Sequence, residues 1–210
     1  MTPATAFVAE RRSARAYWLK TLHQWHWISA ALCLVGLLLF AVTGFTLNHA
    51  GEIESRPRID NRKLQLAPPL RAELKGDDTK ALPPAVREAL AQQLGLALDG
   101  ADAEWSADEI YLSLPRPGGD AWLRIDRSSG AVEYELTDRG WIAYLNDLHK
   151  GRHTGTAWRW FIDVFAAACL VFAGSGLVIL KLHAANRPST WPVVGLGLVV
   201  PLLLALLLIH

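Results

Sequence analysis

The chain has 210 residues, 51% of them hydrophobic, and its formal net charge at pH 7 is +1. This length suits one domain or two small ones, and a net charge near zero gives no electrostatic reason to expect a nucleic-acid partner. Both cysteines, Cys33 and Cys169, lie inside apolar runs. The polar part of the chain therefore has no disulfide framework and no cysteine-ligated metal or iron–sulfur site. We interpret both cysteines as small buried apolar side chains.

The N-terminal segment, residues 1–20, is polar and basic, and an apolar run over residues 27–47 follows it. At about 1.5 Å per residue this run reaches about 31 Å, the thickness of a bilayer core. It is too long for the apolar region of a signal peptide, and no small-residue cleavage site follows. We predict an uncleaved transmembrane helix over residues 21–49, with the basic tail in the cytoplasm and Asn48 emerging outside.

Residues 50–146 are polar and are predicted to form a small soluble domain outside the membrane. Its first part, residues 56–69, shows no clear period and is interpreted as a tether. A helix is predicted at residues 85–94, because two prolines precede it and Gly95 follows it. Alternating apolar residues and turn signals then predict a meander of strands at residues 109–114, 121–126 and 131–136. Such a domain has a thin core, so we expect it to need support from the membrane helices or a partner.

The chain is predicted to return to the membrane through an aromatic segment, residues 141–148, and a basic, histidine-bearing turn, residues 150–153. A second apolar run at residues 160–180 follows. Lys181 and Arg187 come after that run, which places this end in the cytoplasm.

A shorter third run, residues 193–209, crosses the membrane if His210 reaches the outer interface. Residues 147–183 are therefore assigned to the turn and transmembrane helix 2, and residues 184–210 to a cytoplasmic loop and transmembrane helix 3. The predicted fold class is a membrane α-helical bundle of three transmembrane helices. A small α+β exterior domain is inserted between helices 1 and 2.

Histidines cluster near both ends of the predicted spans. Three map to the cytoplasmic edge and three to the outer edge: His23, His26 and His183; and His49, His149 and His153. Neutral imidazole is a strong axial ligand of haem iron, and helical bundles hold such cofactors between facing helices. One bis-histidine haem at each face would carry electrons across the bilayer. The alternative is that interfacial histidines simply extend their polar atoms toward water.

Spacing adds detail to this haem hypothesis. His23 and His49 would be roughly 39 Å apart along a helix, so each would serve a separate haem. His149 and His153 are spaced i,i+4, so that one can bind metal while the other forms a hydrogen bond. Asp163 is the one acid within a predicted span, and an intramembrane carboxylate marks function by default. It can hold the ring N–H of a metal-binding histidine or form an ion pair with a nearby arginine, Arg152 or Arg159.

Glycines in the spans allow two interpretations, close helix packing or contact with the flat face of a macrocycle. They are Gly36, Gly44, Gly174 and Gly176. Plain helix packing is the favoured interpretation.

The first apolar helix resembles that of the PepSY-associated transmembrane family in three motifs: Leu22-His23-Gln24-Trp25, Thr43-Gly44 and Leu47-Asn48-His49. The motif Asp147-Leu148-His149-Lys150-Gly151-Arg152 resembles the segment that opens the next helix of the family, and residues 122–132 are similar to the end of a PepSY domain. The resemblance implies a PepSY-like exterior domain, located in the periplasm, on a multi-pass protein of the bacterial inner membrane.

Larger members of this family are thought to be haem proteins that reduce ferric chelates. The resemblance therefore implies an inner-membrane b-type haem protein, an oxidoreductase that moves electrons from a cytoplasmic or quinol donor to a periplasmic acceptor, either a ferric chelate or a redox partner. The chain has three predicted spans where larger members have four or more, so a haem bundle would call for a homodimer. The alternative is a non-catalytic, membrane-anchored PepSY module that binds a periplasmic partner.

We hypothesise two haem b sites, one per membrane face. His49 and His149 would bind the outer haem iron, and His23 and His183 the inner one. The resemblance carries over to the first three by motif and to His183 by position. Asp163 would orient an outer ligand. Two further histidines are secondary candidates: His26 and His153.

Overall fold

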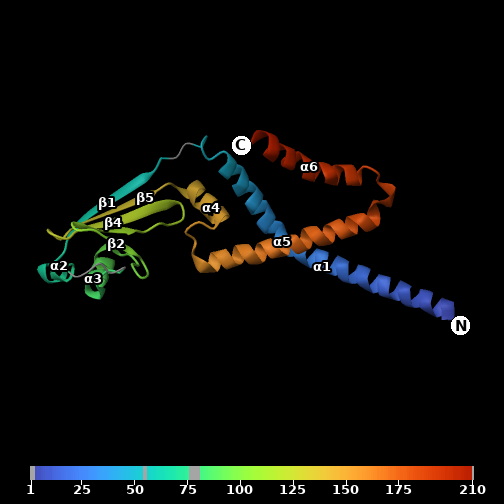
Figure 1. Cartoon of the computed structure of the whole chain (residues 1–210), viewed down its shortest axis with the longest axis horizontal. Helices are drawn as coiled ribbons and strands as arrows, with labels where there is room; N and C mark the ends of the chain where they lie inside the picture. The colour runs from blue at the N-terminus through green and yellow to red at the C-terminus, as the bar shows by residue number, and fades with distance from the viewer. Residues whose placement is uncertain (1–2, 54–55, 76–80, 210) are drawn as a thin grey trace. The chain divides into compact units, whose positions relative to one another are not determined.

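The computed structural model describes residues 3–53, 56–75 and 81–209, so His210 lies outside the described residues. The helices are α1 (Pro3–Asn48), α2 (Pro68–Glu73), α3 (Pro84–Leu94), α4 (Trp141–Lys150), α5 (Gly155–His183), the 3₁₀ helix η1 (Ala184–Asn186) and α6 (Thr190–Leu208). The strands are β1 (Arg58–Gln65), β2 (Ala103–Trp105), β3 (Glu109–Ser113), β4 (Gly119–Asp126) and β5 (Ala131–Asp138) (Figure 1). The chain divides into a helical unit, residues 1–38 and 163–210, and a sheet unit, residues 39–162.

Three helices are long and apolar enough to cross a membrane: Arg15–Asn48 within α1, Gly155–His183 (α5) and Thr190–Leu208 (α6). They confirm the three predicted spans, and the chain is a multi-pass membrane protein. The helix α1 already begins at Pro3, at a position where proline is tolerated because the first helical N–H has no partner. Most of the predicted basic tail is therefore helical and continuous with the first span.

Small residues of α1 pack against α5 within the helical unit. Cys33 is fully buried, and its thiol is in hydrogen-bonding contact with that of Cys169. A Cβ atom on Gly36 would collide with the ring of Phe165, so only glycine leaves room for this ring. Small residues at such positions let membrane helices approach closely. The packing interpretation is confirmed for Gly36, and burial is confirmed for Cys33, while Cys169 is half-buried.

The segment between the first and second spans forms one antiparallel sheet of five strands in the order β1-β5-β4-β3-β2. The predicted helix and the three predicted strands are confirmed as α3, β3, β4 and β5. The tether prediction is wrong, because β1 pairs with β5 along its whole length, from Arg58 opposite Asp138 to Gln65 opposite Ala131. As an edge strand β1 buries few side chains, so it lacks the apolar alternation that reveals a strand. The short elements α2 and β2 were also not predicted.

The helices α2 and α3 cover one face of this sheet (Figure 1). Buried residues of α3, spaced one turn apart, meet apolar side chains of the central strands. Prominent members of this core are Val86, Leu90, Ile110, Leu123 and Ile125. Gly95, in the left-handed conformation at φ 68°, ends α3 as predicted. The strands β1 and β2 widen the sheet beyond the predicted meander.

The helix α4 is fastened to the sheet through a buried carboxylate. Asp147 is 6% exposed, and its Oδ2 accepts a hydrogen bond from the backbone N–H of Gly118 at 2.8 Å. The guanidinium of Arg139 lies 3.7 Å from the same oxygen. A Cβ atom on Gly118 would lie 2.8 Å from the Cα of Tyr144, so the hairpin approaches the backbone of α4 too closely for any other residue. Hydrogen bond, ion pair and close packing together fix α4 against the sheet.

Candidate functional site

Two of the predicted ligands face each other in the helical unit. The ring centroids of His23 on α1 and His183 on α5 are 5.8 Å apart, with their planes at 90°. Each Nδ1 lies 2.8 Å from the carbonyl oxygen one turn earlier, that of Leu19 and that of Ile179, respectively. A carbonyl can only accept, so Nδ1 carries the proton in both rings and Nε2 keeps its lone pair. This is the tautomer that binds a metal through Nε2.

An apolar cavity of 290 Å³ is formed by neighbours of this pair in the chain, and neither histidine lines it. It is lined by Arg15, Trp18, Leu19, Leu22, Val178 and Leu182. Leu19 supplies the carbonyl that holds His23, and Leu182 directly precedes His183. Apolar walls with one guanidinium suit a flat apolar group that carries carboxylates. Two facing imidazoles, a guanidinium and apolar side chains are the residue types that a bis-histidine haem requires, and haem binding here stays a prediction.

His26 belongs to the packing between α1 and α5. Its Nδ1 lies 2.9 Å from the hydroxyl of Ser175 and 3.2 Å from the carbonyl of Phe172. Its ring is stacked on that of Phe172 at 5.0 Å, and a Cβ atom on Gly176 would lie 3.2 Å from it. Gly176 thus admits an imidazole from the facing helix, whereas a Cβ on Gly174 would meet no described atom within 4 Å. His26 joins the two helices by stacking and hydrogen bonding.

His149 in the sheet unit is held by a threonine of α1. Its Nδ1 lies 2.6 Å from Oγ1 of Thr43, and the Thr43 hydroxyl in turn lies 2.9 Å from the carbonyl of Leu39. A hydroxyl has one proton: given to the carbonyl, it makes Oγ1 the acceptor for Nδ1 of His149, and given to His149, it makes Nδ1 the acceptor. In the first arrangement the Nε2 of His149 keeps its lone pair. The ring also packs on Phe40 at 4.9 Å and approaches Gly44, where a Cβ would lie 3.5 Å from it.

His49, directly after α1, also has a hydrogen-bond partner at Nδ1. Its Nδ1 lies 3.0 Å from the carbonyl of Phe45, and its ring packs on that of Phe45 at 4.4 Å. Among the described residues no contact joins the rings of His49 and His149. In the structure the Nδ1 atom of each of these two imidazoles has a hydrogen-bond partner, but the two rings are not in contact. Their pairing on one haem stays a prediction.

His153 lies outside the helix that carries His149, in the predicted turn. The helix α4 ends at Lys150, because Gly151 adopts the left-handed conformation that closes a helix. His153 itself has φ 57°, and its Nε2 accepts a hydrogen bond from Arg152 at 3.1 Å. Its lone pair is thus already used.

Asp163 is exposed on α5. Within the described part of the chain no hydrogen bond or ion pair joins it to Arg152, Arg159 or a histidine. The proposed role in orienting an outer ligand therefore stays a prediction.

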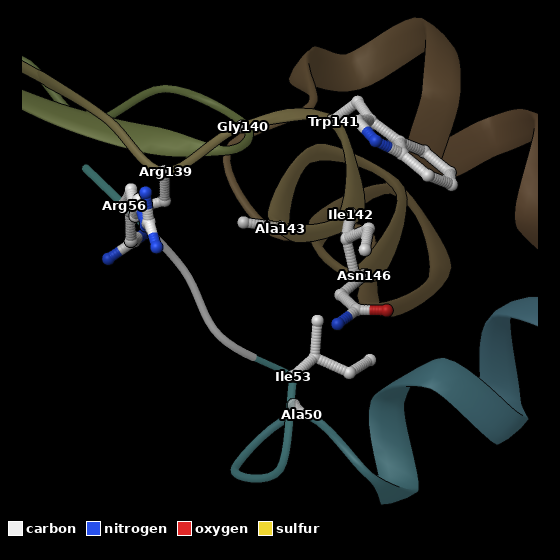
Figure 2. A pocket seen from close by; sticks show the side chains of 9 residues that line it. All are labelled: Ala50, Ile53, Arg56, Arg139, Gly140, Trp141, Ile142, Ala143 and Asn146. Atoms are coloured by element: carbon white, nitrogen blue, oxygen red, sulfur yellow. The ribbon is translucent and has the colours of Figure 1, made fainter. Parts of the chain in front are cut away.

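A second cavity, of 370 Å³, lies in the sheet unit where the end of α1, the sheet and α4 meet. It is lined by Ala50, Ile53, Arg56, Arg139, Gly140, Trp141, Ile142, Ala143 and Asn146. Figure 2 shows Arg56 and Arg139 next to each other at one side of the cavity and Asn146 at another. Sequence reasoning missed this site. The strand register that pairs Arg58 with Asp138 places Arg56 and Arg139 at the same end of the β1–β5 pair. This register could be predicted only if β1 was recognised as a strand.

Comparison with known proteins gives one match. The family described as PepSY_TM-like matches residues 17–210. No curated protein and no solved structure matches the chain.

Proposed function

Because the chain belongs to the PepSY_TM-like family, whose description fits a membrane-anchored PepSY module, we propose that this module is a b-type haem protein that moves electrons across the bacterial inner membrane. The observation that carries the proposal is the facing pair His23 and His183, with both Nδ1 atoms held by backbone carbonyls. A membrane anchor has no need of two such imidazoles.

The residues around this pair have defined tasks. The carbonyls of Leu19 and Ile179 fix the ring orientation and the tautomer. The apolar side chains of the neighbouring cavity would contact the apolar part of haem, while the guanidinium of Arg15 can pair with a carboxylate at its edge. Haem bound here would supply reversible one-electron transfer.

His49 and His149 are the proposed ligands at the opposite membrane face. In both, Nε2 is available for iron when Nδ1 is the atom that donates. The partner of Nδ1 is the carbonyl of Phe45 for His49 and the hydroxyl of Thr43 for His149. Electrons would pass from a cytoplasmic or quinol donor to a periplasmic acceptor, a ferric chelate or a redox partner. A homodimer would supply additional helices around each haem.

The proposed orientation places the N-terminus in the cytoplasm and the sheet unit in the periplasm. Basic residues precede the first span and follow the second, among them Arg15 and Lys20 on α1 and Lys181 and Arg187 around η1. Cytoplasmic loops are enriched in such residues. Both groups then face the same compartment.

The absorption spectrum of the protein purified from haem-replete membranes tests the proposal. We expect a Soret band and an α band that appears on reduction. His23→Ala and His183→Ala should each remove about half of the bound haem, because each abolishes one of two bis-histidine sites. His153→Ala is the matched control and should retain the haem, since Arg152 already occupies its Nε2. A colourless preparation, or equal haem content in all variants, would refute the haem proposal.

The sheet favours the second candidate, a non-catalytic anchor that binds a periplasmic partner. On the face opposite the core, the rings of Tyr111 and Trp122 stack at 6.3 Å, and the indole N–H of Trp122 donates to Glu135 at 3.2 Å. An aromatic pair held in place on an open sheet face is typical of interaction surfaces. A colourless preparation combined with loss of a co-purifying partner in Trp122→Ala would support the anchor instead.

A further inference from the structure

The cavity beside α4 lies where the chain leaves the membrane. The first span ends at Asn48, and two residues that line the cavity, Ala50 and Ile53, follow within a few positions. The helix α4 presents Trp141 and Tyr144 to the outside, 69% and 46% exposed. Such aromatic side chains on an amphipathic helix are typical of the bilayer interface. With the first span placed across the bilayer, the cavity is expected at headgroup depth, independently of which compartment it faces.

Hydrogen-bond donors converge on this cavity. Arg56 and Arg139 lie next to each other (Figure 2), and planar guanidinium groups bind phosphate oxygens through paired N–H bonds. Asn146 is 7% exposed, and its Oδ1 accepts a hydrogen bond from Thr46 at 3.0 Å. The Thr46 hydroxyl shares its proton between this oxygen and the carbonyl of Thr43, 2.9 Å away. The amide N–H₂ group, which can only donate, lies on the other side of the Asn146 amide from Oδ1. The charged and amide donors together call for an anionic oxygen ligand.

The carboxylates around the cavity limit the charge of that ligand. Arg139 is held by Asp120 at 2.9 Å and by Asp147 at 3.7 Å. These contacts fix the guanidinium in position and offset part of its charge. As far as Arg139 is concerned, a singly charged anion is better matched than a multiply charged one. The remaining lining is apolar and includes Ile53, Trp141 and Ile142.

We propose that this cavity binds the phosphate group of a ligand at the membrane surface, and that the phosphodiester headgroup of an anionic phospholipid supplies it. A phosphodiester carries one negative charge, and its glycerol and acyl carbons match the apolar side of the cavity. The cavity volume of 370 Å³ lies within the range of about 300–1,000 Å³ found for small-molecule sites.

Native mass spectrometry of the detergent-solubilised full chain tests the proposal with three probes: dioleoylphosphatidylglycerol, dioleoylglycerol without a phosphate, and inorganic phosphate. Arg56→Gln should weaken phosphatidylglycerol binding about tenfold or more, as expected for the loss of a charged hydrogen bond. Asn146→Asp, which retains the acceptor for Thr46 but adds a negative charge, should weaken it at least as much. Arg58→Gln is the matched control, because this arginine is exposed and does not line the cavity, and it should bind as the wild type does.

The outcomes separate the sources of the phosphate. Binding of dioleoylglycerol should be unaffected by any of the three substitutions. Inorganic phosphate that binds with the same dependence on Arg56, while phosphatidylglycerol does not, would overturn the lipid assignment. Equal phosphatidylglycerol binding by the wild type, Arg56→Gln and Asn146→Asp would overturn the site. Circular dichroism of each variant checks folding, and haem plays no part in the measurement.

Discussion

At the scale of single residues, the ability of a histidine to bind metal depends on the partner of its second nitrogen. His23, His49 and His183 lie in or directly after a helix, where the carbonyl one turn earlier accepts from Nδ1. This hydrogen bond could be predicted from the sequence, because a helix offers each side chain the carbonyl one turn earlier. The partner of His149 could not, since Thr43 is 106 positions away. The sequence likewise identified the candidate histidines without showing which of them meet.

Asp126 provides a prediction about pH. Its carboxylate accepts backbone and side-chain hydrogen bonds from Ser128 and Ser129, which lower its pKa from 3.8 to about 2. Since the pKa is lower in the folded state, this stabilisation is complete above pH 3.8 and is lost as the pH falls toward about 2. We expect the Ser128 and Ser129 amides to lose hydrogen-exchange protection over this range. In Asp126→Asn the protection should already be reduced at neutral pH and should not change over the same range.

At the scale of elements, the sequence predicted the helices and strands that depend on residues close to one another in the chain. The helix α3 and the strands β3, β4 and β5 carry their own periodicity and turn residues, and all were predicted close to their observed bounds. The strand β1 depends on pairing with β5, which is distant in sequence, and its polar edge shows no apolar alternation. The cavity between Arg56 and Arg139 depends on that same pairing and was missed for the same reason. The helix break before His153 did have a local signal in Gly151.

The packing of α1 on α5 provides a prediction at this scale. Gly36→Leu should force the ring of Phe165 away and weaken the helix contact, an overpacking cost of about 1–3 kcal/mol. Gly174→Leu is the matched control, because no described atom lies within 4 Å of a Cβ there. The contact between Cys33 and Cys169 supplies the measurement. Copper-phenanthroline oxidation should cross-link these thiols efficiently in the wild type and in Gly174→Leu, and less in Gly36→Leu. Equal yields in all three proteins would contradict the packing argument.

At the scale of the whole molecule, run length and the positions of basic residues predicted the three spans, because the bilayer imposes both constraints on the sequence itself. The orientation follows from the same basic residues and can be measured. Asp99→Cys, in the sheet unit with a side chain 88% exposed, should react with an impermeant maleimide in intact cells. Ala185→Cys, in η1, should react only after the membrane is opened. The reverse pattern would place the sheet unit in the cytoplasm.

The attachment of α4 to the sheet has a mechanical consequence. The carboxylate that joins α4 to the β3–β4 hairpin belongs to Asp147, two positions before His149. Gly118 packs directly on the backbone of Tyr144, so the hairpin and the helix are expected to move together. A ligand that displaced the hairpin would therefore displace the imidazole of His149 as part of the same rigid body, and with it the hydrogen bond to Thr43 on α1. Occupancy of the sheet unit would thus be transmitted to His149 without any change of secondary structure.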